Sequence, residues 1–260
     1  KEASVSDFLY EIPRPFFEGR GFLLPGHIDL ASFGSDLEYD FRARSPLPEK
    51  DGLMRYDVDA FERRKASFFS NLRARFKRDL AGVVDFVIID TPPSREFLTQ
   101  IALGIADYVV PVLSPGTKEL DGLEDMERLM AQAWISYNPD LRIPGVLLNE
   151  AYEREVLTKH IKDELFERYK GHKLTLETIV PRSVRIAEAT SNDITIFESD
   201  HPEAQRYQDV YRSVVRELNS RALNLSGTKV FSPEFFYDLH FNDSTELKEF
   251  IEEEREVANG

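Results

Sequence analysis

The stretch VVDFVIID (83–90) decides the fold class, because it is a short run of β-branched and aromatic residues that ends at a carboxylate. An apolar run of this length is typical of a strand buried on both faces of a parallel sheet. The residues that follow, Thr91-Pro92-Pro93-Ser94, fix the backbone as it leaves the strand and supply a cap for a helix. We therefore predict a strand over 84–90 and a helix over 94–106.

The alternation of strand and helix continues on the C-terminal side of this stretch. Further strands are predicted over 107–113, 142–149 and 174–180, adjacent to 84–90 in one sheet. Helices are predicted over 58–80, 119–134, 153–169 and 203–222. The expected fold class is α/β, a doubly wound, mostly parallel sheet with helices on both faces. Such sheets bind ligands at the carboxyl ends of their strands, so the residues after each strand are the candidates for chemistry.

Composition excludes several classes of protein. The 260 residues include no cysteine, which excludes a disulfide framework, a thiol nucleophile and a cysteine-held iron–sulfur cluster, and fits a cytoplasmic location. With 33 basic and 47 acidic residues the net charge is −14, so attraction of the whole protein to nucleic acid or an anionic membrane is not expected. The charge is uneven: residues 61–79 hold seven basic and two acidic residues, whereas 227–260 hold three basic and nine acidic.

Asp90 is the first candidate for chemistry. A carboxylate at the tip of a buried strand can hold Mg²⁺ through water, or orient an attacking water beside a phosphate. The alternative is that Asp90 only caps the turn.

Four segments resemble, in order, the ParA/MinD superfamily of ATPases, which carry a deviant Walker A motif. They are DFVIIDTPPS (85–94), ADYVVPVLSPGTKELDGLEDM (106–126), NPDLRIPGVLLNE (138–150) and TIVPRSVRIAEATSNDITI (178–196). A weaker resemblance is found in GFLLPGHIDLASF (21–33). The likeness is closest to ParA/Soj-type partitioning ATPases and covers residues 1–222, which we take as the ATPase domain. Residues 223–260 are an acidic, aromatic-containing C-terminal extension, whose strip 231–241 is expected to fold back on the domain.

The resemblance implies ATP and Mg²⁺ as ligands and gives the site residues their roles. Asp90 would be the catalytic switch aspartate, close to the γ-phosphate and bound to Mg²⁺ through water, with Thr91 and Pro92 beside it in the nucleotide site. Asn149 would contact the adenine edge, and Pro181 and Arg182 would line the base pocket. Plainer alternatives are a turn former for Asn149, a strand end for Pro181 and a surface charge for Arg182.

Two departures from the family pattern stand out. The Gly-rich phosphate loop of the family is absent, because no G-x-x-x-x-G-K-[ST] occurs in the sequence. The simplest explanation is a truncation before Lys1, in which case the chain as printed should not hydrolyse ATP at a family-like rate; the alternative is a natural pseudo-ATPase. The second departure is Thr190-Ser191-Asn192-Asp193, where the family favours Pro-Ser-x-Gly.

By resemblance the protein is expected to partition plasmid, chromosome or other cargo as an ATP-dependent homodimer in the cytoplasm, associated with the nucleoid. It would bind DNA non-specifically and be stimulated by a ParB-like or other adaptor protein, without a membrane. Arg185, Arg212 and Arg216 are the expected DNA contacts. The competing surface is the basic helix, with Arg63, Arg64, Arg73, Arg75 and Arg78. Two alternatives stay open: a non-catalytic binding module, and a MinD-like membrane-associated regulator, which the acidic segment near residue 250 disfavours.

Overall fold

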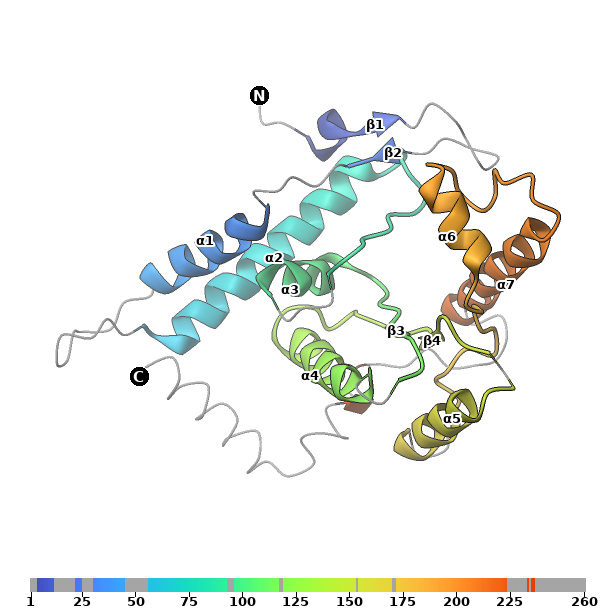
Figure 1. The fold of residues 1–260 in the computed structure, drawn as a ribbon. Helices are drawn as coiled ribbons and strands as arrows, with labels where there is room; N and C mark the ends of the chain where they lie inside the picture. The colour runs from blue at the N-terminus through green and yellow to red at the C-terminus, as the bar shows by residue number, and fades with distance from the viewer. Residues whose placement is uncertain are drawn as a thin grey trace.

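The computed structural model describes residues 4–11, 22–24, 30–44, 56–92, 96–116, 119–152, 154–169, 172–223, 233 and 235–236. Within them the fold is α/β, as the sequence predicts. Figure 1 places the strands β3 (Val112–Leu113) and β4 (Leu147–Leu148) between the helix α4 (Glu119–Ser136) on one side and the helix α7 (Ala204–Ala222) on the other. A two-stranded antiparallel ribbon, β1 (Tyr10–Glu11) with β2 (Phe22–Leu23), lies apart from this sheet.

Three of the four predicted strands form a parallel ladder. β3 pairs with β4 in the register Val112 to Leu147, and a parallel bridge from Tyr108 to Arg142 extends this pairing toward the start of both segments. On the other side of β4, the Val146 N–H donates to the carbonyl of Leu174 at 3.0 Å. The segments 107–113, 142–149 and 174–180 are therefore adjacent in that order, with 142–149 in the middle.

Helices cover both faces of this ladder because side chains alternate along β4. Leu148 points into the main core, together with residues of α3 (Phe97–Ile105), α4 (Glu119–Ser136) and α5 (Val156–Arg168). Leu147 points the other way and packs with Val214 and its neighbours on α7 (Ala204–Ala222). The alternation of faces along a strand thus builds the two helical layers that the doubly wound class requires.

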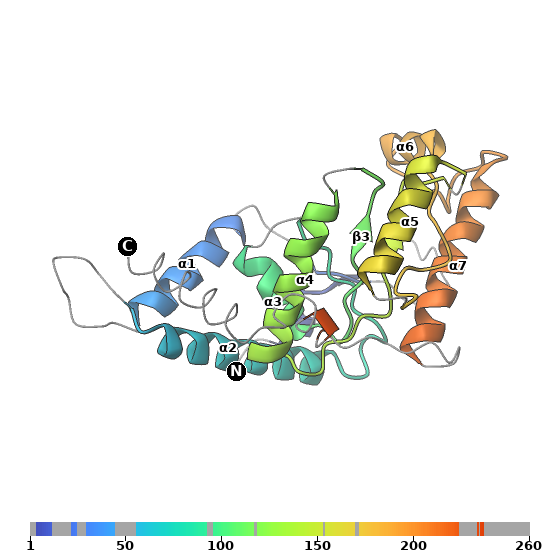
Figure 2. The same ribbon diagram turned by 90° about the horizontal axis from the view of Figure 1, so that it is seen from below.

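The helix α1 (Leu30–Ala43) and the beginning of α2 (Val58–Leu80) lie at the end of the molecule that is far from α6 (Val184–Ser191) and α7 (Figures 1 and 2). The Asp57 side chain accepts from the Ala60 N–H at 3.0 Å and caps α2 where the sequence predicts its start. Phe69 of α2 is fully buried against α3. Gly104 allows this approach, because a Cβ there would lie 3.0 Å from the Phe69 ring.

The prediction that 84–90 is a paired strand is wrong for the described residues. The segment is extended, but none of its backbone groups bonds to another described strand. Its apolar side chains are exposed, with Phe86 at 77% and Ile88 at 94%. The run has the composition of a central strand, yet its burial depends on neighbouring strands that the described residues do not supply.

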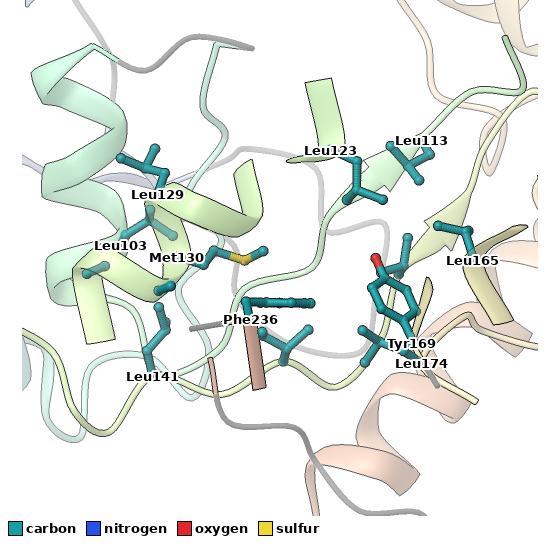
Figure 3. Packing of buried hydrophobic residues seen from close by; sticks show 14 of the residues in the cluster. Leu103, Leu113, Leu123, Leu129, Met130, Leu141, Leu165, Tyr169, Leu174 and Phe236 are labelled. Carbon is teal, nitrogen blue, oxygen red and sulfur yellow. The ribbon is translucent and has the colours of Figure 1, made fainter. Parts of the chain in front are cut away.

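The aromatic strip 231–241 returns to the domain where it is described. Phe236 is fully buried, and Figure 3 shows its ring among Met130, Leu141 and Tyr169. Its ring centroid lies 5.9 Å from that of Tyr169. The other residues of the strip, except Pro233 and Phe235, lie outside the described residues. In the described part of the chain, no helix combines the length and the apolar character needed to cross a membrane.

Candidate functional site

The carboxyl ends of two adjacent strands bring three of the predicted site residues together. Asn149 directly follows β4 and is positioned by its own N–H, which donates to the Leu113 carbonyl at 2.7 Å. The Ala151 N–H donates to the Val180 carbonyl at 3.1 Å, so the chain after Asn149 runs beside Pro181 and Arg182. Asn149 is half-buried and Arg182 is exposed, which leaves polar groups accessible at this edge of the sheet.

Tyr152 closes this edge and was not identified from the sequence. Its hydroxyl donates to the Arg182 carbonyl at 2.6 Å and ties the segment after β4 to the segment after 174–180. Glu150 precedes it with φ of 53°, a left-handed conformation that turns the chain sharply away from the strand. We call Asn149, Tyr152, Pro181 and Arg182 the edge cluster.

Asp90, Thr91 and Pro92 lie outside the edge cluster. All three are exposed at the end of the unpaired stretch, and no hydrogen bond or ion pair connects them with the edge cluster within the described residues. Among the described residues, no group of three or more His, Cys, Asp or Glu side chains is arranged to hold a metal ion. Within the described residues, the residues predicted to contact the base thus lie together at the edge cluster, whereas Asp90, Thr91 and Pro92 lie apart from them.

The arginines predicted to contact DNA differ in how much of their charge is free. Arg185 lies on α6 (Val184–Ser191), where its guanidinium bonds to Glu188 at 2.8 Å and to Glu203 at 2.9 Å. Hydrogen bonds to Glu188, and then to Glu203, raise the pKa of Arg185. Because two carboxylates surround it, Arg185 contributes little net positive charge to this surface.

Arg212 and Arg216 of α7 line one hollow of about 960 Å³ between α6 and α7. Arg212 bonds to Asp209 at 3.0 Å and lies 5.5 Å from the centre of the Phe197 ring. Arg216 is exposed. The floor of the hollow is apolar, with Ile186 and Val215 among its residues. The structure therefore brings Arg212 and Arg216 together, as the spacing on one helix face predicts.

Asp193 explains how the departure Thr190-Ser191-Asn192-Asp193 is accommodated. It follows the last turn of α6 with φ of 54°, the left-handed region that favours glycine. Aspartate is one of the few other residues that adopt this conformation. Its N–H donates to the Thr190 carbonyl at 3.1 Å. The backbone thus adopts the turn that the glycine of the family pattern would favour.

The competing basic helix is α2, and most of its arginines are neutralised. Arg73 bonds to Asn138 and, at 2.8 Å, to Asp107. Burial of the Asp107 carboxylate would raise its pKa, but hydrogen bonds from Lys77 and Arg73 outweigh this effect, and the pKa is lowered.

Arg75 and Arg78 both bond to one carboxylate, that of Asp79, at 3.6 and 2.9 Å. Arg63 and Arg64, by contrast, are exposed on the first half of α2. The charge of α2 that is available to a ligand is therefore concentrated near the start of the helix.

A buried arginine and a half-buried glutamate, both overlooked in the sequence analysis, hold α7 against the sheet. Arg221 is only 4% exposed and donates to the carbonyls of Pro144, Lys173, Leu174 and Thr175 at 3.0–3.3 Å. It also bonds to Glu217 at 2.8 Å. Burial would raise the pKa of Glu217, but the N–H groups of Glu177 and Thr178, followed by Arg221, lower it. The only feature of the sequence that could have predicted this ion pair is the i, i+4 spacing of Glu217 and Arg221 on one helix.

Comparisons with known proteins agree with this fold. A family model described as an AAA domain matches residues 17–143. The chromosome partitioning protein ParA of Myxococcus xanthus is 36% identical over 114 residues, which are 44% of this chain and 40% of that protein. The sporulation initiation inhibitor protein Soj of Bacillus subtilis is 33% identical, over 55% of this chain and 56% of that protein.

A third relative, the chromosome-partitioning ATPase Soj of Thermus thermophilus, is 31% identical over 53% of each chain. The chain thus spans about half the length of the curated relatives it matches. Among solved structures, the cobyrinic acid a,c-diamide synthase of Mycobacterium smegmatis superposes with a TM-score of 0.55 at 21% identity. That match covers 88% of this chain and 72% of the synthase, and supports the fold class.

Proposed function

Because this chain is a member of the ParA/MinD superfamily, we propose that it works as a ParA-like ATPase that partitions or positions plasmid, chromosome or other intracellular cargo. The observation that carries the proposal is the edge cluster, where Asn149 and Arg182 follow adjacent parallel segments that bonds from Ala151 to Val180 and from Tyr152 to Arg182 hold together. Ligands of doubly wound sheets bind at this edge. The names of the relatives, ParA and Soj, support the partitioning role.

The base of ATP would lie on the edge cluster in this proposal. The side-chain amide of Asn149 has both donors and an acceptor, which match the exocyclic amine and ring nitrogens of adenine. Pro181 and the stem of Arg182 would border the ring, and the Tyr152 hydroxyl keeps the Arg182 backbone in place. ATP bound with Mg²⁺ would supply a phosphate for transfer to water when the phosphate loop is present.

The phosphates need groups that the printed sequence does not contain, since it has no Walker A pattern. The unpaired stretch 84–90 supports the proposal that a further strand, carrying a phosphate loop at its carboxyl end, pairs there in the complete protein. Such a strand would pair with the backbone of 84–90, and the helix that follows it could cover Phe86 and Ile88, which are 77% and 94% exposed. It would also bring the loop beside Asp90, which follows the same stretch.

Hydrolysis by the protein from the complete gene tests this proposal. We expect ATP turnover that Asp90→Ala abolishes, because the carboxylate that orients the attacking water is lost. Asp85→Ala is the matched control, since Asp85 is an exposed carboxylate on the same unpaired stretch. A complete protein without turnover, or with turnover that Asp90→Ala leaves unchanged, would favour the non-catalytic binding module.

We also propose that the complete protein binds DNA as an ATP-dependent homodimer, which would present Arg212 and Arg216 twice. A chain of net charge −14 needs such a local surface, because the whole molecule repels DNA. When the logarithm of the association constant for duplex DNA is plotted against the logarithm of the salt concentration, each phosphate contact contributes a slope of about −0.9. Replacing both arginines by alanine should therefore flatten this slope while the dimer persists. A flattened slope in Arg64→Ala/Arg75→Ala alone would instead place the contact on α2.

The partner in this proposal is a ParB-like or other adaptor protein that stimulates turnover. The resemblance to ParA/Soj-type partitioning ATPases implies such a partner, and the cargo would depend on which adaptor is used.

A further inference from the structure

A basic groove between α1 and α2 is separate from the edge cluster and from the hollow beside α7. It has a volume of about 510 Å³, and its sides combine aromatic and basic residues from the end of α1 and one face of α2. The residues of this groove are Phe41, Arg44, Ala60, Arg63, Arg64, Ser67, Phe68 and Asn71. On α2 their spacing of three or four residues makes a continuous stripe along the helix.

The floor of the groove is apolar and fixed. The rings of Phe41 and Phe68 meet edge to face with centroids 5.5 Å apart, and both residues pack against the main core. Neither ring is fully buried, so each leaves apolar surface in the groove. A ligand for this floor must therefore carry apolar side chains of its own.

The rim of the groove is positive. Arg44 bonds to Asp40 at 2.8 Å, so its charge is compensated. Arg63 and Arg64 are exposed and form no hydrogen bond or ion pair with any described residue. Two free guanidinium groups beside an aromatic floor select an occupant that is both acidic and amphipathic.

The chain contains one segment of this chemistry, residues 243–257. It lies outside the described residues, so only its sequence bears on the proposal. It holds seven acidic and two basic residues, and Leu247, Phe250 and Ile251 follow the i, i+3, i+4 pattern of one helix face. Ten residues separate Glu246 from Phe236 and span at most about 33–36 Å. Phe236 belongs to the core cluster against which Phe41 and Phe68 also pack.

We propose that the acidic segment 243–257 docks as an amphipathic helix in the groove between α1 and α2 of its own chain. Leu247, Phe250 and Ile251 cover the floor, and the flanking glutamates bond to Arg63 and Arg64. The contact neutralises the most available charge of α2, so it competes with any other acidic ligand of that surface.

Energy transfer between two dyes tests the proposal on the full chain. The sequence has no cysteine, so Ser70→Cys on α2 and Asn259→Cys give two unique attachment points. We expect efficient transfer in the parent protein at low salt. In the Arg63→Glu/Arg64→Glu variant the ratio of high- to low-transfer molecules should fall at least tenfold, because the charges then repel.

Two further variants make the test specific. Arg154→Glu/Lys159→Glu changes the net charge equally at exposed positions near α5, and should leave transfer unchanged. Glu252→Lys/Glu253→Lys should restore transfer to the Arg63→Glu/Arg64→Glu variant. Transfer that is equal in all variants, or an equal loss in the α5 control, would overturn the proposal. Loss of transfer on tenfold dilution would also overturn it, because the groove would then hold the segment of a second copy.

Discussion

Gly145 lies where the middle strand passes beneath α7, and its replacement by alanine probes the packing of that helix on the sheet. An added Cβ would lie 2.6 Å from Leu176 Cδ2, 2.9 Å from the Leu174 carbonyl oxygen and 3.0 Å from Arg221 Nη1. The leucine methyl can rotate away. The carbonyl cannot move freely, because it accepts from the Val146 N–H at 3.0 Å and is part of the ladder.

The expected cost of Gly145→Ala is about 1–3 kcal/mol, the usual range for an extra methyl forced into a closely packed site. At roughly 2–4 °C per kcal/mol for a domain of this size, the melting temperature should fall by about 2–12 °C. Urea unfolding followed by circular dichroism should show a lower midpoint with an unchanged slope, since the surface exposed on unfolding is the same.

Gly122→Ala is the matched control. Gly122 lies inside α4, and a Cβ there would meet no atom within 4 Å. The substitution should raise stability by about 0.5–1 kcal/mol, because alanine is the better helix former. Two results would contradict the close packing of Arg221 and the strand against Gly145. One is a Gly145→Ala variant as stable as the parent; the other is a Gly122→Ala variant whose free energy of unfolding falls by as much as that of Gly145→Ala.

Three further predictions concern α7 and the end of α6. Arg221→Met should cost about 1–3 kcal/mol in urea unfolding, because the backbone carbonyls of Pro144, Leu174 and Thr175 lose the buried donor that Arg221 supplies. A loss well below about 1 kcal/mol would contradict the role of Arg221 in holding α7 against the sheet. The lowered pKa of Glu217 contributes stability above its unfolded value of about 4.3, which is lost as pH falls through the folded value. In Glu217→Gln the free energy of unfolding should therefore fall less steeply as the pH is lowered through the acid range. An unchanged acid dependence would show that the pKa of Glu217 is not lowered in the folded state. Asp193→Gly should raise the free energy of unfolding by about 1 kcal/mol, because glycine adopts a φ of 54° without strain, whereas a lower melting temperature would oppose it.

The sequence was sufficient for elements whose signal is local. The helix α2 begins and ends at the residues predicted, since Asp57 caps its start and Phe61 and Phe69 lie on its buried face. The strands predicted over 107–113 and 142–149 are present as the shorter β3 and β4, with a parallel bridge from Tyr108 to Arg142 near their starts. They were predictable because an apolar, β-branched run between turns is a local pattern. The stretch 84–90 has the same pattern, but pairing depends on a neighbour, which no local pattern supplies.

The sequence did not predict which residues bond to the arginines of the candidate sites. Glu188, three residues after Arg185 on α6, is visible as a partner from helix spacing. Glu203, the second partner, lies 18 residues away and reaches Arg185 only through the packing of the chain. Tyr152 was missed for the same reason, because its hydrogen bond to Arg182 joins segments 30 residues apart. Long-range contacts of this kind determine which arginines stay available for a ligand.

The central claim is that the base of a nucleotide lies at the edge cluster, beside Asn149. Competition between ATP and GTP for the protein from the complete gene tests this claim most directly. Binding of a fluorescent ATP analogue should be displaced by ATP much more readily than by GTP, because the Asn149 amide matches the adenine edge. Asn149→Ala should weaken ATP about tenfold and reduce the preference over GTP, the usual range for a lost bidentate contact to a base being about 1–3 kcal/mol. Asn192→Ala, an exposed asparagine after α6, is the control and should change neither. An unchanged preference for ATP in Asn149→Ala would contradict the placement of the nucleotide base at the edge cluster.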